Sequence, residues 1–109
     1  KEILKTVQAK KSVVEVGNDV SVGHNAIIHG AKVGSDVLVG MGAILMDNAI
    51  VPDGTIIAAG AVVLGGTELE SGVYAGVPAR KVKPGSEDIT AAARKNAAGY
   101  LKYKEWYKD

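Results

Sequence analysis

The chain has 109 residues, a formal net charge of +1 and no cysteine. This length fits one domain, and the lack of cysteine excludes disulfides and thiolate chemistry. No apolar run reaches the roughly 18 residues of a membrane-spanning helix, and no secretory signal opens the chain. We therefore expect a cytoplasmic protein with no membrane partner.

The apolar residues are small or β-branched. There are 15 Val and 15 Ala, but no Phe and only one Trp. Such residues suit strands, and 14 Gly are too many for a helical bundle. Residues 80–109 carry a small basic excess with acids interspersed, which favours a solvated helix over a nucleic-acid partner.

A period of six organises the chain from Val16 onward, after an irregular start over residues 1–12. From Gly30, residues that tolerate positive φ recur at every sixth position: Gly30, Asp36, Gly42, Asn48, Gly54, Gly60, Gly66 and Gly72. Three positions after each stands an aliphatic residue: Val33, Val39, Leu45, Val51, Ile57, Val63, Leu69 and Ala75. Because six is a multiple of two, the same strand face returns each time, which predicts short strands wound into a narrow prism.

The period slips once upstream. Val16, Val22 and Ile28 are six apart, but Gly30 follows the turn residue Asn25 by only five. We expect the deletion within residues 24–29, and about three and a half coils between residues 16 and 80.

The period changes beyond Pro78 and Pro84. Ser86 is a plausible N-cap, with Glu87 and Asp88 in the first helical turn. Apolar residues then recur at helical spacing: Ile89, Ala93, Ala97, Tyr100, Tyr103 and Tyr107. The domain organisation is thus predicted as a β-helix over residues 1–85 and a packing helix over residues 86–109.

The two histidines, His24 and His29, lie on either side of the slip. Each precedes a turn residue and follows an aliphatic residue by two positions, Val22 and Ile27, so we expect equivalent outward sites. Zinc–nitrogen bonds are only about 2.0–2.1 Å long. Histidines on two successive corners of one prism are too far apart to bind the same metal ion. Metal binding would therefore need a second chain, and a closed cyclic trimer matches the threefold cross-section.

Three segments carry a resemblance to a known family. Residues 22–31 (VGHNAIIHGA), 39–43 (VGMGA) and 75–79 (AGVPA) resemble the gamma-class carbonic anhydrases, and residues 100–107 are similar to the terminal helix of bacterial members. The resemblance implies a left-handed parallel β-helix followed by a C-terminal helix. It also implies a homotrimer with Zn2+, or Fe2+ or Co2+, at subunit interfaces, where a metal-activated hydroxide hydrates CO2 to bicarbonate.

The resemblance also assigns residues. His29 matches the ligand paired with an earlier histidine of the same chain, and His24 matches the ligand given across the interface. Tyr100 matches a tyrosine near the site. The third ligand is absent, because Lys5 stands near its expected place, and the first coils of the family are lacking.

Two alternatives remain open. A hexapeptide-repeat acyltransferase would use acyl-CoA and a catalytic histidine without metal, usually with a loop that interrupts the repeats. A non-catalytic assembly subunit would need neither acyl-CoA nor a catalytic histidine.

Overall fold

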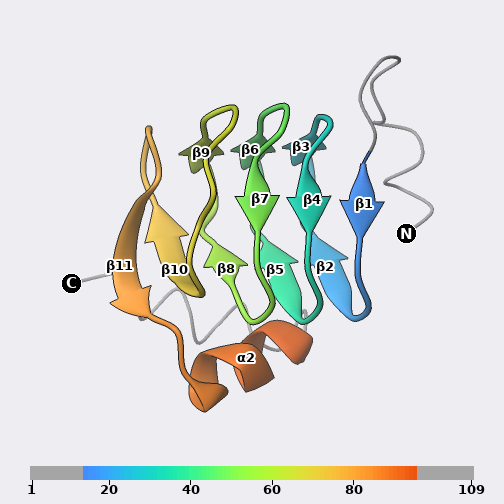
Figure 1. Ribbon diagram of the computed structural model, residues 1–109. Coiled ribbons are helices and arrows are strands. Elements are labelled where there is room, and N and C mark those ends of the chain that lie inside the picture. Colours follow the sequence, from blue (N-terminus) through green and yellow to red (C-terminus); the bar gives the residue numbers. More distant parts are fainter. Residues whose placement is uncertain (1–13, 96–109) are drawn as a thin grey trace.

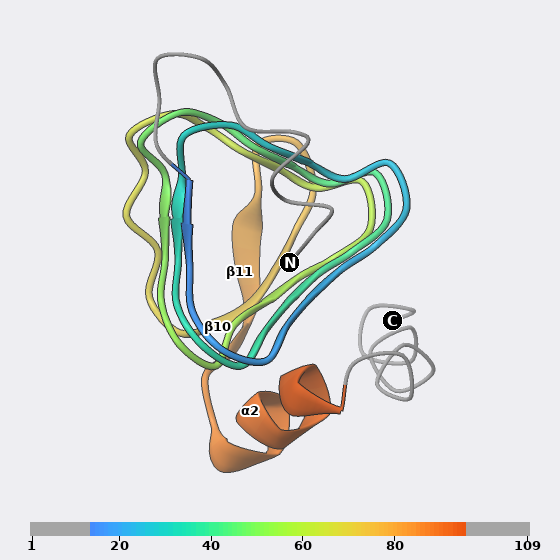
Figure 2. The same cartoon turned by 90° about the vertical axis from the view of Figure 1, so that its right-hand side faces the viewer.

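The chain winds as a parallel β-helix of triangular cross-section in the computed structural model, which describes residues 14–95 (Figures 1 and 2). Sheet A contains β1 (Glu15–Val16), β4 (Lys32–Val33) and β7 (Ile50–Val51). Sheet B contains β2 (Val20–Val22), β5 (Val37–Val39), β8 (Ile56–Ile57), β10 (Gly72–Ala75) and β11 (Arg80–Pro84). Sheet C contains β3 (Ile27–Ile28), β6 (Ile44–Leu45) and β9 (Val62–Val63). The helix α2 (Glu87–Arg94) follows, which confirms the predicted fold class.

The predicted aliphatic positions fill the prism. The six from residue 33 to residue 63 are at most 4% exposed: Val33, Val39, Leu45, Val51, Ile57 and Val63. Alanines and Thr55 occupy the buried corner positions. Each such aliphatic side chain contributes roughly 1.5–3 kcal/mol through burial. One aliphatic residue per side of each coil leaves no room for Phe, which explains the unusual composition.

Most corners are type II turns. Their third residue lies in the left-handed region, with φ between 56° and 74°, at Asp19, Asn25, Asp36, Gly42, Asn48, Gly54, Gly60 and Gly66. Five of these turns are closed by a backbone N–H that donates three residues back, from Ala26, Ala43, Ala49, Ala61 and Thr67. The turn type requires positive φ at that position, so Gly, Asn and Asp recur there.

The predicted slip is a shortened corner after β3. Ile28 pairs with Leu45, 17 residues on, whereas Lys32 pairs with Ile50, 18 residues on. The missing residue therefore lies just after Ile28. The Ala31 N–H donates to the His29 carbonyl at 2.5 Å, closing a three-residue turn around Gly30, which is not among the positive-φ positions.

A second shortened corner was not expected. Ile50 bridges Glu68 at 18 residues, but Ile56 and Ile57 pair with Val73 and Tyr74 at 17. Tyr74 therefore takes the interior position predicted for Ala75, and the prediction for Ala75 is wrong. Gly72, at this corner, has φ 156°, far from the values of the other turns.

The C-terminal end of the prism is closed by chain reversal. β11 pairs antiparallel with β10, a strand that the sequence pattern did not predict. Ser86 caps α2 as expected, with its Oγ accepting from the Ile89 N–H at 3.2 Å, and Ile89 and Ala93 are buried. The other positions of the predicted apolar stripe, from Ala97 onward, lie outside the described residues.

Candidate functional site

The three faces of the prism differ in what covers them. The outward side of sheet B packs under α2, where Leu38, Ile56 and Val73 contact Ile89 and Ala93 in a second buried cluster. Figure 2 shows α2 alongside the prism at one of its corners. The outward side of sheet B is therefore covered by α2 of the same chain.

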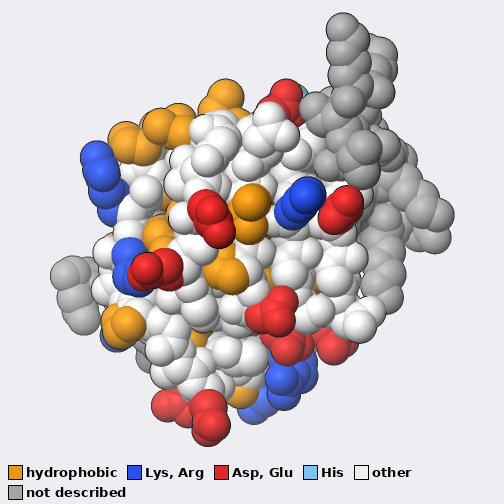
Figure 3. Space-filling view, viewed as in Figure 1, with side chains coloured by type: hydrophobic (Ala, Val, Ile, Leu, Met, Phe, Trp, Pro, Cys, Tyr) orange, Lys and Arg blue, Asp and Glu red, His pale blue; other side chains and the backbone are white. Residues whose placement is uncertain are grey.

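The outward side of sheet A is mixed in character. Glu15, Lys32, Ile50 and Glu68 follow one another across its successive coils. Figure 3 views the molecule from this side and shows acidic, basic and apolar side chains interspersed. Such a face suits contact with water.

The outward side of sheet C is apolar and uncovered by the described residues. Ile27, Ile44 and Val62 occupy the same outward place on β3, β6 and β9. Five of the seven exposed large apolar residues found within residues 14–95 lie on this sheet or beside it: Ile27, Met41, Met46, Leu64 and Val77. An apolar patch of this kind marks an interaction surface.

The two histidines lie at the two edges of sheet C, on its first coil. His24 is in the turn that precedes β3, and His29 follows β3 directly. Both side chains are exposed. Within residues 14–95, neither imidazole makes a hydrogen bond or an ion pair, so both nitrogens of each ring are available to a ligand.

The two positions are not equivalent, contrary to the prediction. Ile28 is fully buried and Ile27 is 39% exposed, so Ile28 is the inward residue that precedes His29. His29 thus follows its inward residue by one position, whereas His24 follows Val22 by two. The reason is the shortened corner, which lies after Ile28 and leaves the upstream register unchanged through β3.

The described residues hold two of the predicted site residues and no complete metal cluster. Within residues 14–95, no group of three or more His, Cys, Asp or Glu side chains is placed to hold one ion. Lys5 and Tyr100 lie outside the described residues. A site built on His24 and His29 would therefore need donors from elsewhere.

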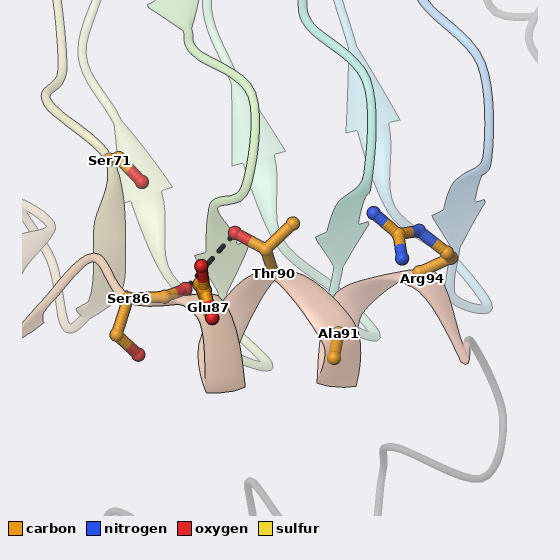
Figure 4. Close-up of a pocket in the computed structure, with 6 residues that line it drawn as sticks. All are labelled: Ser71, Ser86, Glu87, Thr90, Ala91 and Arg94. Carbon is orange, nitrogen blue, oxygen red and sulfur yellow. Dashed lines mark hydrogen bonds between the residues drawn. The ribbon is translucent and has the colours of Figure 1, made fainter.

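A polar groove runs beside α2 and was not foreseen from the sequence. It has a volume of about 590 Å3 and is lined by Ser71, Ser86, Glu87, Thr90, Ala91 and Arg94 (Figure 4). Its polar groups already serve the fold. Ser71 Oγ donates to the Gly54 carbonyl, Thr90 Oγ1 donates to the Ser86 carbonyl, and Arg94 pairs with Asp36. Of these three interactions, the pair between Arg94 and Asp36 joins the helix to the prism.

Comparison with known proteins agrees with this architecture. The family model "Bacterial transferase hexapeptide (six repeats)" matches residues 30–65. Protein YrdA of Escherichia coli is 46% identical over 95 residues, which cover 86% of this chain and 52% of that protein. Gamma carbonic anhydrase 2, mitochondrial, of Arabidopsis thaliana is 37% identical over 87 residues, covering 79% of this chain and 31% of that protein. The chain spans about half the length of YrdA and less of the plant protein.

Among solved structures, a hexapeptide transferase family protein from Anaplasma phagocytophilum superposes with a TM-score of 0.67. The two share 30% sequence identity over 88% of this chain and 63% of that one. The six-residue repeat, the stacked coils and these matches define a hexapeptide-repeat protein. Within that class, the chain belongs to the gamma-carbonic-anhydrase-like family.

The described part of the chain contains no candidate for a membrane-spanning helix. No helix within residues 14–95 has the length and apolarity that a bilayer crossing requires.

Proposed function

We propose that the chain is a gamma-carbonic-anhydrase-like metalloprotein that assembles as a homotrimer through the outward face of sheet C. One observation carries the proposal. His24 and His29 flank the one prism face that is both apolar and uncovered by described residues. A contact on this face between copies would bring histidines of neighbouring subunits toward each other.

The donor chemistry fits a divalent transition metal. Neutral imidazole is the commonest metal ligand among side chains, and it suits zinc and iron. Catalytic zinc sites use three protein ligands and keep one position open. His24 and His29 would supply two donors per interface, and Lys5, near the expected place of a third, is protonated at neutral pH and a poor ligand.

The proposed reaction is reversible hydration of CO2. A metal ion held by these residues supplies a water acidified to a pKa of about 7, the chemistry that CO2 hydration needs. The roles of this chain are to bind the ion through His24 and His29, and to exclude bulk water from the apolar face around them. Tyr100 is proposed to lie near the site.

A matched pair of substitutions tests the assembly surface. Ile27 on sheet C and Ile50 on sheet A each begin a two-residue strand, and they are 39% and 37% exposed. We expect Ile27→Glu to shift the native mass from trimer to monomer, and Ile50→Glu to leave it unchanged. Equal native masses for both variants and the parent would contradict the proposed surface.

Metal content tests the site itself. We expect the purified full chain to hold a divalent transition metal, and the paired variant His24→Ala/His29→Ala to lose it. CO2 hydration, followed by the pH change on mixing, should fall with the metal. The metal site would be excluded if the purified chain held no transition metal and if the His24→Ala/His29→Ala variant formed the same trimer as the parent. That result would not contradict the proposed assembly surface.

Acyl transfer is the second candidate. It is favoured by the transferase family model and by the hexapeptide transferase among the similar structures. Against it, no inserted loop interrupts the coils between Gly30 and Leu69, where stacked residues stay 18 apart. Acetyl-CoA that raises the melting temperature of the chain, with no effect of a metal chelator, would favour this function over the first.

A further inference from the structure

The side chain of Asp47 holds the shortened corner that follows His29. Its Oδ1 accepts a hydrogen bond from the Gly30 N–H at 2.9 Å, across 17 residues of sequence and one coil of the prism. The Gly30 nitrogen belongs to the peptide group that joins His29 to Gly30. Asp47 therefore fixes the backbone directly after His29, although the two residues lie in different coils.

The backbone directly before His29 is fixed from the same neighbouring coil. The His29 N–H donates to the Leu45 carbonyl at 2.9 Å. Together with the bond from Gly30 to Asp47, both peptide groups that flank the His29 Cα are bonded to the second coil. A Cα held on both sides has a fixed Cα–Cβ direction, and the backbone angles fixed in this way restrict the side-chain rotamers. The direction of the imidazole thus depends on Asp47.

The corner at Gly30 has more need of such a bond than a regular corner. A regular corner, such as residues 46–49, is a four-residue turn closed by a backbone N–H that donates three residues back. The shortened corner is closed instead by the bond from the Ala31 N–H to the His29 carbonyl. Its middle residue is glycine, which has the widest range of backbone conformations. The side chain of Asp47 restricts that range from outside the corner.

Asp53 makes the same kind of bond at a corner without histidine. Its Oδ1 accepts from the Ser35 N–H at 2.7 Å, 18 residues back. Ser35 and Gly30 are both the second residue of their corners, and Asp53 and Asp47 hold the second place one coil later. A carboxylate at this place can thus serve the winding of the chain alone. Comparison of the two aspartates separates that role from a role toward His29.

We propose that Asp47 is the positioning residue of His29 in the metal site, acting as the hydrogen-bond acceptor for the peptide group between His29 and Gly30. This role rests on the proposed function, in which His29 is a metal ligand. The bond lies within one chain, so it is compatible with a neighbouring subunit that covers sheet C. Loss of a group that orients a metal ligand weakens metal binding by about 10–100-fold.

Titration of the metal-stripped full chain with Co2+, followed by its visible absorption, measures the role of Asp47. We expect Asp47→Ala to raise the dissociation constant about tenfold or more. Asp47→Asn keeps an oxygen that accepts from the Gly30 N–H, and it should bind Co2+ nearly as the parent does. Asp53→Ala, the matched control, removes the same kind of bond and should leave Co2+ binding unchanged. If Asp47→Ala does not fold, Asp47→Gly replaces it, because Gly65 holds the same place one coil later.

Relaxation NMR provides a readout that needs no metal. The order parameter of the His29 Cα–Hα bond should fall in metal-free Asp47→Ala and stay at the parent's value in Asp47→Asn. A His29 order parameter that is the same in Asp47→Ala and the parent would overturn the positioning role.

The Co2+ titrations separate this role from the metal site on which it rests. The role of Asp47 alone is overturned if the parent binds Co2+ and Asp47→Ala binds it equally well, or if Asp53→Ala weakens binding as much. It is also overturned if Asp47→Asn binds as weakly as Asp47→Ala, since the negative charge would then matter and not the bond to Gly30. A parent chain that binds no Co2+ would overturn the metal site itself, and the role of Asp47 with it.

Discussion

Arg94 on α2 pairs with Asp36 on the corner before β5, across 58 residues of sequence. Its Nε donates to Oδ1 at 3.0 Å and its Nη2 donates to Oδ2 at 3.2 Å. A two-point pair fixes orientation as well as distance. One helical turn earlier, Thr90 lies against Gly54, which is the corner residue one coil on from Asp36.

The stability of this contact should depend on pH. The hydrogen bonds from Arg94, and next to them its charge, hold the pKa of the Asp36 carboxyl below its ordinary value. A lowered folded-state pKa contributes stability that is present above the unfolded pKa of about 3.9 and is lost as pH falls through the folded value. We expect Asp36→Asn to destabilise the chain at pH 6, and parent and variant to converge in urea unfolding near pH 2.

A double-mutant cycle isolates the pair. In an Arg94→Met background, Asp36→Asn should have no pH-dependent effect on the free energy of unfolding. A difference between parent and Asp36→Asn that stays constant from pH 6 to pH 2 would show that this ion pair is not its source.

Gly54 should be the least replaceable of the four glycines at the left-handed turn position, which are Gly42, Gly54, Gly60 and Gly66. Gly54 and Gly66 have φ 69° and 73°, so alanine costs about 1–2 kcal/mol at either from the left-handed backbone. A Cβ at Gly54 would in addition collide with Thr90 Oγ1 on α2, whereas one at Gly66 meets nothing within 4 Å. We expect Gly54→Ala to lower the free energy of unfolding by about 1–3 kcal/mol more than Gly66→Ala.

Thr90→Ala provides the control for that comparison, because it removes the atom that collides. In the Thr90→Ala background, Gly54→Ala and Gly66→Ala should have nearly equal costs in chemical denaturation. Costs that remain unequal would place the extra strain in the corner itself rather than in helix packing.

Tyr74 should stabilise the closed end of the prism through its hydroxyl. The hydroxyl accepts from the Glu70 N–H at 3.1 Å and donates to the Glu70 carbonyl at 2.8 Å, while the ring is buried in the core. Tyr74→Phe leaves the two backbone groups unpaired and should cost about 1–3 kcal/mol. Tyr74→Ala also opens a cavity and should cost about 3–5 kcal/mol in thermal or urea unfolding. Equal costs would mean that the ring contributes no packing.

The sequence predicted the coils well because turn chemistry and side-chain size agree at each corner. It failed where two candidates stood side by side. Ile27 and Ile28 are both aliphatic, so composition could not tell which faces inward once a residue was missing. At the other short corner, Ala75 fitted the period, but Tyr74 reaches the interior because its ring fills the last coil and its hydroxyl satisfies the backbone of Glu70.

The apolar face of sheet C could not be recognised from periodicity alone. The six-residue period constrains the turn residues and the inward aliphatic residues, but not the outward positions of the strands. In the sequence, Ile27, Ile44 and Val62 therefore appeared only as additional aliphatic residues. Strand pairing brings these three into one column, with a histidine at each edge of its first coil. The candidate site thus combines a motif visible in the sequence with a surface that only the stacking of coils creates.

The shortened corner at Gly30 gives a direct test of why the period slips beside His29. Inserting Asp between His29 and Gly30 would make this corner match the next one, where Asp47 and Asn48 follow Met46. Gly30 tolerates the positive φ of a type II turn, so the variant should keep its circular dichroism spectrum and melt within a few degrees of the parent. The added residue would project at the edge of sheet C beside His29 and obstruct a neighbouring subunit. We therefore expect loss of the trimer and of bound metal, measured by native mass and metal analysis. A folded variant that still assembles and binds metal as the parent does would show that the deletion serves the winding of the chain and not the site.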